Sequence, residues 1–433
     1  MKPKIEKWSQ EDRTGAAAQF LARPAFDEEA RATARQILAE VKKSGDKAVA
    51  KYTREFDGAA LRPEQFAVTK AELAQARDAV AREVKNAIRE VHRRIGAFSK
   101  ASLKKEWLIS SPRGGLLGEQ FAPLDRVGIY IPGGAAPLVS TAIMTATPAR
   151  VAGVPHIVAC TPCDAEGKVN PALLHALETA GATEIYRLGG VQAIGAMAYG
   201  TETIAKVQKI VGPGGTYVTA AKREVYGDVA LDMVAGPSEI AVLADDTAPA
   251  AYVAADLLSQ AEHGTGWEKA LLATPSHRFA EAVAAEVEKQ AAALSRRECV
   301  EKVIEHGMLL AVTNTLDDAM DLCNRFAPEH LEIMVREPKN WLKKVHCAGA
   351  VFVGTCSPEV AGDYVAGPSH VLPTGGTAAM FSGLTADDFR KRTSVIAFTR
   401  ADLHDAMPVI EIFGKLEGMD GHVQSAKIRF DKP

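Results

Sequence analysis

Hydrophobic residues in the first hundred positions recur at steps of three and four. Between residues 80 and 98 they form one apolar stripe, with Arg and Glu on the other faces, through Val80, Val84, Ile88, Val91, Ile95 and Phe98. This spacing places apolar side chains on one face of an α-helix. We therefore predict helices over residues 28–100 that pack against a core, with His92, on the flank of the stripe, at the surface.

From about residue 124 the pattern changes to short β-branched runs that end in glycine and alternate with helical stretches. This alternation is typical of βαβ units and parallel sheets. The predicted strands are 126–131, 156–160, 184–188, 209–211, 239–243, 331–335, 348–353 and 394–399. Two packed α/β sheets fit this number of strands better than one, and a helix over about 401–419 follows as a separate arm.

Three glycine-rich turns come where predicted strands end, at 131–134, 188–190 and 212–215, and none of them matches GxGxxG. Glycine lets backbone N–H groups approach a phosphate closely, and a following helix N-terminus adds a favourable dipole. Ordinary tight turns use the same residues. The pattern therefore leaves a nucleotide site and plain turns both open.

Acidic and basic residues are interspersed along the 433 residues, and the formal net charge is −3. With no basic stripe or polybasic tail, we expect neither nucleic acid nor a membrane as partner. We expect an untargeted soluble protein, because the N-terminus has no apolar segment and no run of 18 apolar residues occurs.

The six cysteines are sparse, which favours a reducing compartment, the cytoplasm. Cys160 and Cys163 form a CxxC pair without a second pair, which we interpret as a strand-to-loop turn.

A predicted helix over residues 248–263 ends in Leu-Leu-Ser-Gln-Ala-Glu-His. Gln260 and His263 are three residues apart, so they project from one helix face, which suits two ligands of one metal. A plain helix end, at which His263 meets the helix dipole before Gly264, fits the same residues. Spacing alone favours the plain helix end.

Glu329 and His330 are adjacent, after a helix that Pro328 stops and before a predicted strand. A carboxylate beside an imidazole can do general acid and base work, because His transfers protons near neutrality and Glu can activate water. A solvated Glu-His turn fits equally well.

Two later stretches also carry candidate groups. Asp363 and His370 lie in a long segment rich in glycine and proline. Long structured loops are usually functional, although a lone Asp in one is normally a turn former. Glu417 and His422 lie near the C-terminus, where a histidine is by default a surface residue.

Taken together, these segments resemble histidinol dehydrogenase from about residue 30 to residue 430. The resemblance rests on nine motifs in the family's order: VGIYIPGG, GGVQAIGAMAYGT, KIVGPG, DMVAGPSEIAVLAD, LLSQAEH, NRFAPEHLEI, GAVFVG, GDYVAGPSHVLPTGGTA and EGMDGHVQSAKIR. Short motifs match by chance, whereas nine in order do not. The fold class that we expect is α/β, with two Rossmann-like parallel-sheet domains that lack GxGxxG, an N-terminal helical segment and a C-terminal arm.

The expected domains are four. They are an N-terminal segment (1–25), a first α/β domain with the metal and catalytic residues (26–129 with 236–381), a second α/β domain on the NAD side (130–235), and an arm that reaches the partner subunit (382–433).

The resemblance implies one zinc per subunit. The family binds it through Gln, His, Asp and a His from the partner subunit, which correspond here to Gln260, His263, Asp363 and His422. Only the aspartate in that set carries charge, so the site stays electrophilic. The implied substrate contacts are Ser238, Gln260, His263, Glu329, His330, Asp363, His370, Glu417 and His422. A shared site implies a homodimer with closed two-fold symmetry.

The family reaction is the four-electron oxidation of L-histidinol to L-histidine through L-histidinal, the last step of histidine biosynthesis, with two NAD used in turn. By this resemblance His330 removes the hydroxyl proton in each step, and Glu329 activates the water that adds to the aldehyde. Zinc holds and orients the substrate rather than generating hydroxide.

The implied NAD contacts are Tyr130, Gln192 and Gly215. The family has Asn at the last of these positions, and losing its hydrogen bond costs on the order of 0.5 to 1.5 kcal/mol unless Thr216 replaces it.

Two alternatives remain open. A relative with the same zinc and base could oxidise another diol, such as a sulfonated propanediol, and would then replace imidazole-recognising groups with cationic ones. His370 and Glu417 favour the imidazole substrate, whereas Gly215 and the loop 264–267 depart from the family. A non-catalytic module that keeps the metal but not NAD is the second alternative, and the retention of Glu329, His330 and all four ligands argues against it.

Overall fold

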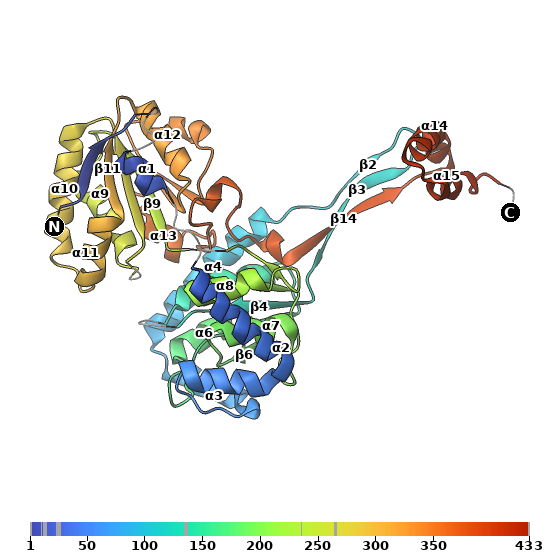
Figure 1. Ribbon diagram of the computed structural model, residues 1–433, viewed down its shortest axis with the longest axis horizontal. Coiled ribbons are helices and arrows are strands. Elements are labelled where there is room, and N and C mark those ends of the chain that lie inside the picture. Colours follow the sequence, from blue (N-terminus) through green and yellow to red (C-terminus); the bar gives the residue numbers. More distant parts are fainter. Residues whose placement is uncertain are drawn as a thin grey trace. The chain divides into compact units, whose positions relative to one another are not determined.

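The structure is a computed structural model that describes residues 2–9, 11, 15–22, 27–133, 137–234, 236–263 and 266–431. The chain divides into two compact units (Figure 1). Unit 1 comprises Met1–Ser102 and Asp125–Phe389, and unit 2 comprises Leu103–Leu124 and Arg390–Pro433. Unit 1 contains two parallel sheets with helices on both faces, so the predicted fold class is confirmed.

The first sheet of unit 1 has the strand order β1-β11-β10-β9-β12-β13, and every neighbouring pair is parallel. Its strands are β1 (Lys4–Lys7), β9 (Glu239–Ala244), β10 (Lys269–Thr274), β11 (Met308–Val312), β12 (His330–Met334) and β13 (Ala350–Val353). The helices α9 (Ala250–Ala261), α10 (His277–Ala291) and α11 (Arg297–His306) cover one face, and α1 (Ala16–Leu21) and α12 (Leu316–Phe326) cover the other (Figure 1). The central strands are mostly apolar because both faces are buried, although β9 and β12 also bury Glu239, His330 and Glu332.

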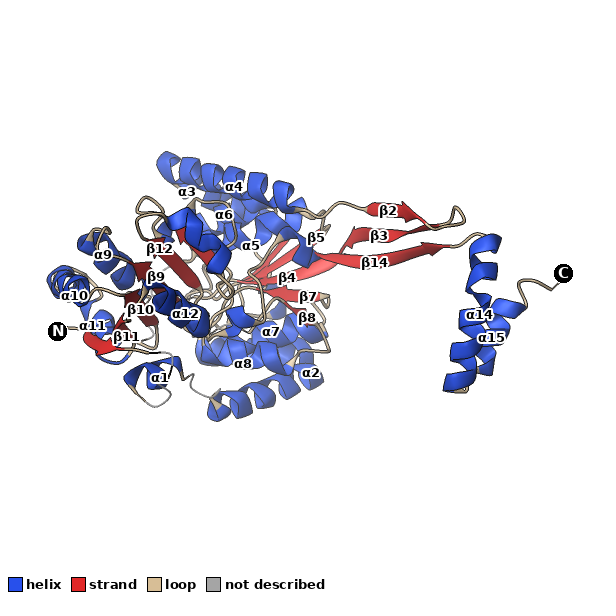
Figure 2. Cartoon of the chain, turned by 90° about the horizontal axis from the view of Figure 1, so that it is seen from above, coloured by secondary structure: helices blue, strands red, loops and turns tan. Residues whose placement is uncertain are grey.

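The second sheet of unit 1 has the order β6-β5-β4-β7-β8, again all parallel. Its strands are β4 (Arg126–Tyr130), β5 (His156–Cys160), β6 (Glu184–Tyr186), β7 (Lys209–Val211) and β8 (Ala230–Leu231). One face carries α2 (Glu28–Phe56), α7 (Gly190–Tyr199) and α8 (Thr216–Glu224), and the other carries α3 (Lys70–Ala79), α4 (Arg82–Ser102), α5 (Val139–Val151) and α6 (Pro171–Ala180) (Figure 2). Unit 1 also contains α13 (Glu359–Tyr364) and the 3-10 helices η1 (Pro63–Gln65), η2 (Pro338–Lys344), η3 (Thr377–Ala379) and η4 (Ala386–Phe389).

The helices over residues 28–102 pack on a different sheet from the one that the expected domain division gave them. We expected 26–129 to accompany 236–381, but α2 packs on α7 and α8, and α4 packs on α5. Gly195 permits the close approach, because a Cβ there would lie 3.1 Å from side-chain atoms of Leu38 and Val41. The apolar stripe predicts that these helices pack, but it cannot say on which sheet.

Two smaller expectations also change. The segment 1–25 is not separate, because β1 pairs with β11 and Trp8 and Phe20 are buried in the core of the first sheet. The expectation of a surface His92 is wrong: the side chain is half-buried, and its Nδ1 lies 2.9 Å from Thr147 Oγ1 of α5.

Unit 2 is an antiparallel sheet followed by two helices. The strand order is β14-β3-β2, with β2 (Trp107–Ser110), β3 (Leu116–Pro123) and β14 (Arg390–Ala397), and the helices are α14 (Arg400–Glu417) and α15 (Asp420–Lys427). The expected arm, 382–433, therefore lacks the hairpin 103–124 that pairs with β14. Asp402 joins the two pieces, because its carboxylate accepts hydrogen bonds from Ser111 Oγ (2.6 Å) and from the N–H of Gly115 (3.1 Å) and Thr399 (2.9 Å).

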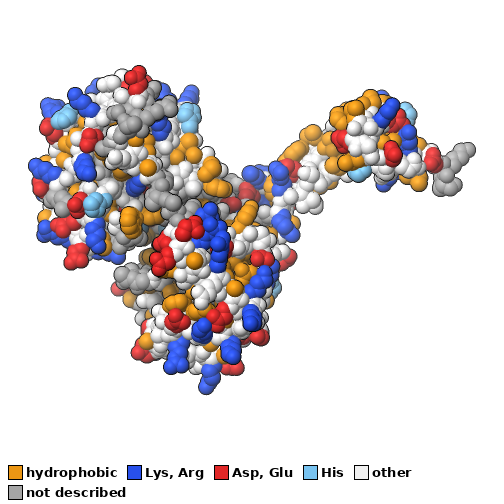
Figure 3. Space-filling view, viewed as in Figure 1, with side chains coloured by type: hydrophobic (Ala, Val, Ile, Leu, Met, Phe, Trp, Pro, Cys, Tyr) orange, Lys and Arg blue, Asp and Glu red, His pale blue; other side chains and the backbone are white. Residues whose placement is uncertain are grey.

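Charged side chains of both signs are interspersed on the surface, as they are along the sequence. Lys and Arg side chains lie intermixed with Asp and Glu on the face shown in Figure 3. Within the described ranges, no helix combines the length and the apolar character that a membrane span needs. Unit 2 exposes Val409, Ile412, Phe413 and Leu416 of α14, each at 57% or more.

Candidate functional site

His330 is the first residue of β12, and its side chain is buried at 3% exposure. Its Nδ1 lies 3.1 Å from the carbonyl oxygen of Glu239 and 3.1 Å from Oε1 of Gln260. Both neighbours are acceptors, so we assign the ring proton to Nδ1. Burial lowers the pKa of His330 to about 4. The ring is therefore neutral near pH 7, and its Nε2 lone pair faces Asp363 Oδ1 at 3.9 Å.

The turn before β12 sets the position of Glu329. Helix α12 ends at Phe326, and Ala327 adopts left-handed backbone with φ 47°. That conformation costs an L-residue roughly 1–2 kcal/mol. It turns the chain so that Glu329 Oε2 accepts the N–H of Glu239 at 3.1 Å. Burial raises the pKa of Glu329 well above its ordinary value.

Gln260 and His263 lie together at the end of α9. Gln260 is fully buried in the last turn, and its Nε2 lies 3.2 Å from Nδ1 of His263. The helix stops at Ala261, and His263 follows with an exposed side chain. Gln260 also contacts His330, so the two candidate ligands lie beside the Glu329–His330 pair. A plain helix end, which the spacing alone favoured, does not explain this arrangement.

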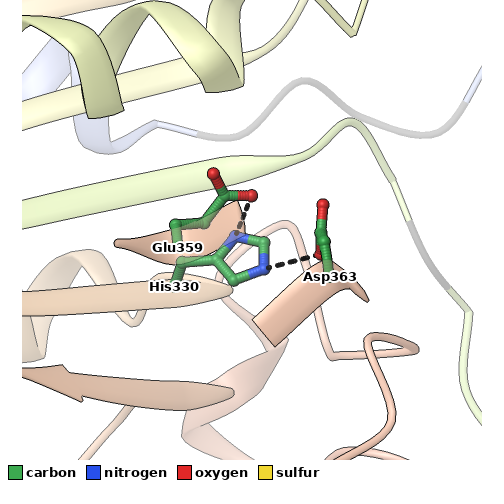
Figure 4. A group of neighbouring side chains, drawn as sticks. All are labelled: His330, Glu359 and Asp363. Atoms are coloured by element: carbon green, nitrogen blue, oxygen red, sulfur yellow. Dashed lines mark ion pairs between the residues drawn. The ribbon is translucent and has the colours of Figure 1, made fainter. Parts of the chain in front are cut away.

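Asp363 comes with a second carboxylate that sequence reasoning missed. Glu359 and Asp363 are one turn apart on α13, and Figure 4 shows the His330 ring between them. Glu359 Oε1 lies 4.0 Å from His330 Nδ1, and burial raises the pKa of Glu359 to about 8. One ligand atom from each of these three residues lies within 4.8 Å of the others. Glu359 precedes Asp363 by four residues, which places both side chains on one helix face. This spacing is the sequence signal that could have identified Glu359 as a candidate.

The remaining candidates divide between the two units. His370 joins the cluster, with Nδ1 3.9 Å from Asp363 Oδ1 and Nε2 3.2 Å from Thr141 Oγ1 of α5, and burial lowers the pKa of His370. Ser238 is next to Glu239, which contacts both Glu329 and His330. Glu417 ends α14 and His422 lies in α15, so both belong to unit 2, where both are exposed.

A further pair of buried acids lies beside the cluster. Glu332 of β12 and Asp256 of α9 lie within hydrogen-bonding reach of each other, an arrangement that a proton on one of the two carboxyls stabilises. Glu332 Oε1 also accepts the N–H of Glu359 at 2.7 Å. Burial raises the pKa of Glu332 well above its ordinary value and that of Asp256 to about 6.

The candidate metal ligands fit a zinc ion. Gln260, His263 and Asp363 offer oxygen and nitrogen atoms, which zinc accepts as ligands. The cluster also has a surplus of negative charge, because Asp363 adds to burial in raising the pKa of Glu329 and of Glu359. A dication would offset that repulsion.

The candidate NAD contacts lie at the carboxyl ends of strands in the second sheet. Tyr130 ends β4, and its hydroxyl accepts the N–H of Gly190 at 3.0 Å. Gln192 is fully buried, and neither polar atom of its amide has a hydrogen-bond partner within the described ranges. Gly215 caps α8. An orphaned buried amide at this edge fits a polar ligand such as a dinucleotide. Gly134 of the first turn and Gly264 lie outside the described residues.

Other features do not contribute to this chemistry. Cys160 is fully buried, and burial raises the pKa of its thiol to about 12, which agrees with a structural CxxC turn. Surface hollows of about 720 and 480 Å³ lie elsewhere on unit 1 and are lined by none of the candidate residues.

Comparison with known proteins identifies the family. The family model described as histidinol dehydrogenase matches residues 22–430. Histidinol dehydrogenase of Heliobacterium mobile is 47% identical over 92% of this chain and 93% of its own length, and that of Moorella thermoacetica is 48% identical over 92% and 94%. The crystal structure of histidinol dehydrogenase from Elizabethkingia anophelis superposes with a TM-score of 0.94 at 35% identity, covering 99% of this chain and 98% of that one. The chain belongs to the histidinol dehydrogenase family.

Proposed function

We propose that the protein oxidises L-histidinol to L-histidine through L-histidinal, the last step of histidine biosynthesis, with one zinc per subunit and two NAD used in turn. The observation that carries the proposal is the neutral His330 ring, whose Nε2 lone pair faces Asp363 at 3.9 Å beside buried Glu329. Relatives at 47% and 48% identity carry the name histidinol dehydrogenase.

Gln260, His263 and Asp363 would hold the zinc, with His422 from a second copy of the chain. When bound, zinc supplies a positive charge that orients the imidazole and amine of the substrate. Ser238 and His370 would contact the same substrate, and Glu417, which belongs to unit 2 as His422 does, would take the charge of the amine from the second copy.

His330 acts as the base in both oxidations. In the first, Nε2 takes the proton of the alcohol O–H while a hydride leaves the same carbon for the nicotinamide of NAD, which gives the aldehyde. Glu329 then accepts a proton from the water that adds to the aldehyde. Once Nε2 has released its first proton to solvent, it takes a proton from a hydroxyl of the hydrated aldehyde while a hydride leaves the same carbon for a second NAD, which gives the acid.

Tyr130, Gln192 and Gly215 form the NAD side of the site. The orphaned amide of Gln192 supports this assignment, because a buried unpaired amide costs about 1–3 kcal/mol unless a ligand pairs with it. The segment around His370 connects the two sides, since Ser369 Oγ donates to the carbonyl oxygen of Met144 in α5 at 3.0 Å.

A shared site requires a homodimer. The apolar side chains that α14 exposes, among them Phe413 (57%) and Leu416 (75%), support unit 2 as the contact between copies, because contiguous exposed apolar side chains mark interfaces.

Oxidation of another diol, such as a sulfonated propanediol, is not favoured. The relatives quoted above are all named histidinol dehydrogenase. The site also gathers acidic and imidazole groups rather than the cationic ones that a sulfonate requires.

The test is NAD reduction with L-histidinol, with and without a chelator. We expect two NADH for each L-histidinol, loss of turnover with the chelator, and recovery with added zinc. Turnover of a sulfonated propanediol but not of L-histidinol would replace the substrate. Metal binding with no turnover would support the non-catalytic module instead.

A further inference from the structure

Asp57 lies at the end of α2, where it follows Phe56 as the C-cap residue. Its carboxylate accepts the backbone N–H of Gly189, the residue that caps the N-terminus of α7. The other carboxylate oxygen, Oδ2, is buried and has no hydrogen-bond partner among the residues that the structure describes. A buried carboxylate oxygen without a donor requires an explanation.

The carboxylate lies among the loops that follow β4, β5 and β6. A Cβ on Gly189 would lie 2.6 Å from Pro162 Cβ and 3.3 Å from Asp57 Oδ1. Asp57 is also close enough to influence the ionisation of Tyr130 and Cys163. The carboxyl edge of parallel strands is where open α/β sheets bind nucleotides, so Asp57 faces the candidate NAD side.

The N-terminus of α7 is already occupied by protein groups. The N–H of Gly189 donates to Asp57, and the N–H of Gly190 donates to the Tyr130 hydroxyl at 3.0 Å. These two amides cannot receive a phosphate, and the negative charge of Asp57 repels one. The same helix carries the fully buried and unpaired amide of Gln192, which independently indicates a polar ligand at this end.

We propose that Asp57 is the residue that makes this site select NAD over NADP. Its free oxygen accepts a ribose hydroxyl, and its charge disfavours a phosphate ester at that position. This chemistry is the one by which acidic residues of other dinucleotide sites distinguish a free 2′-hydroxyl from a 2′-phosphate. The inference rests on the proposed use of a nicotinamide dinucleotide and adds the group that sets its specificity.

The test is Asp57→Asn, because the amide oxygen of Asn can still accept the Gly189 N–H while the charge is removed. Equilibrium binding of NAD and of NADP is measured by titration calorimetry on the full-length protein, beside L-histidinol turnover. We expect discrimination between NAD and NADP to fall on the order of ten- to a hundredfold. Glu55→Gln removes the same charge from an exposed position two residues earlier on α2 and should leave discrimination unchanged.

The outcomes separate the two proposals. Unchanged discrimination in Asp57→Asn, with or without a lower melting temperature, would reduce Asp57 to a structural cap of α7. Absence of binding of both dinucleotides to the unsubstituted protein would also overturn the inference. Dinucleotide binding that loses its discrimination in Asp57→Asn, together with no turnover of L-histidinol, would support the inference and reject the proposed reaction.

Discussion

Nδ1 of His330 lies 3.1 Å from Oε1 of Gln260, so the candidate base and a candidate zinc ligand contact each other directly. A carbonyl oxygen has two lone pairs, and the amide can therefore hold the ring proton and a metal together. The contact fixes the tautomer that leaves Nε2 free. Metal binding and base catalysis thus depend on the orientation of one amide.

His330→Asn tests the role of Nε2. The Asn amide reaches the position of Nδ1 and can still donate to the Glu239 carbonyl oxygen, but nothing replaces Nε2. We expect kcat to fall by about 10²–10⁴ with the melting temperature and zinc content retained. Steady-state kinetics and metal analysis provide the measurements, and a variant that keeps more than a tenth of the activity would exclude His330 as the base.

Gly215→Asn tests the departure from the family's NAD site. Apart from chain neighbours, no described heavy atom lies within 4 Å of where its Cβ would be, and its φ of −67° suits any residue. We expect up to about tenfold tighter NAD binding, because one hydrogen bond is regained.

The control is the adjacent Gly214→Asn. A Cβ there would lie 2.3 Å from Val218 Cγ1, so we expect a loss of stability and no gain in affinity. If NAD binding is unaltered in Gly215→Asn, Thr216 or another group already compensates.

Glu332→Gln tests the buried acid pair through the pH dependence of stability. Burial raises the pKa of Glu332, so the stabilising effect of its proton is complete below the ordinary value of 4.5 and disappears as the pH rises through the folded-state value. Gln keeps a donor for Asp256 and an acceptor for the Glu359 N–H but does not titrate. The free energy of unfolding of the variant, relative to that of the wild type, should therefore increase as the pH rises, by at most about 1.4 kcal/mol per pH unit.

Urea unfolding at three pH values between 6 and 9 measures that difference. Glu332→Ala, which leaves both partners unpaired, should be less stable throughout. A difference between Glu332→Gln and the wild type that does not change with pH would mean that Glu332 holds no proton in the folded state.

Mixed dimers test whether His422 acts across the subunit interface. His422→Asn and His330→Asn should each be inactive alone. If His422 completes the site of the other copy, a mixed dimer has one intact site, and random mixing after unfolding and refolding restores about a quarter of wild-type activity. No recovery from verified mixed dimers would place His422 in the site of its own chain or outside the site.

The parts that sequence predicts best are those with local patterns. The strands that start at 126, 156, 184, 209 and 239 are found where their β-branched runs place them. The hairpin 103–124 was missed because its pairing with β14, more than 250 residues later, leaves no local signal. The packing of α2 on the second sheet was missed for a related reason, since an apolar stripe does not specify its partner.

The same limit applies to the site. Gln260 with His263, and Glu329 with His330, are visible as neighbours in the sequence, whereas their convergence on one imidazole is a property of the fold. Asp57 carried no signal, because an Asp followed by Gly after a helix is an ordinary turn sequence. Its meaning depends on Gly189, which follows β6 and lies far from Asp57 in the sequence.

The central claim is that one zinc ion is held beside His330, a base that does not itself bind the metal. An anomalous-scattering map of crystals at the zinc absorption edge tests this claim most directly. The account predicts one peak per subunit, at about 2.0–2.2 Å from atoms of Gln260, His263 and Asp363 and from His422 of a second copy, with His330 Nε2 unbound. A peak coordinated by His330, Glu359 and Asp363, which also lie close enough to bind a metal, would contradict it.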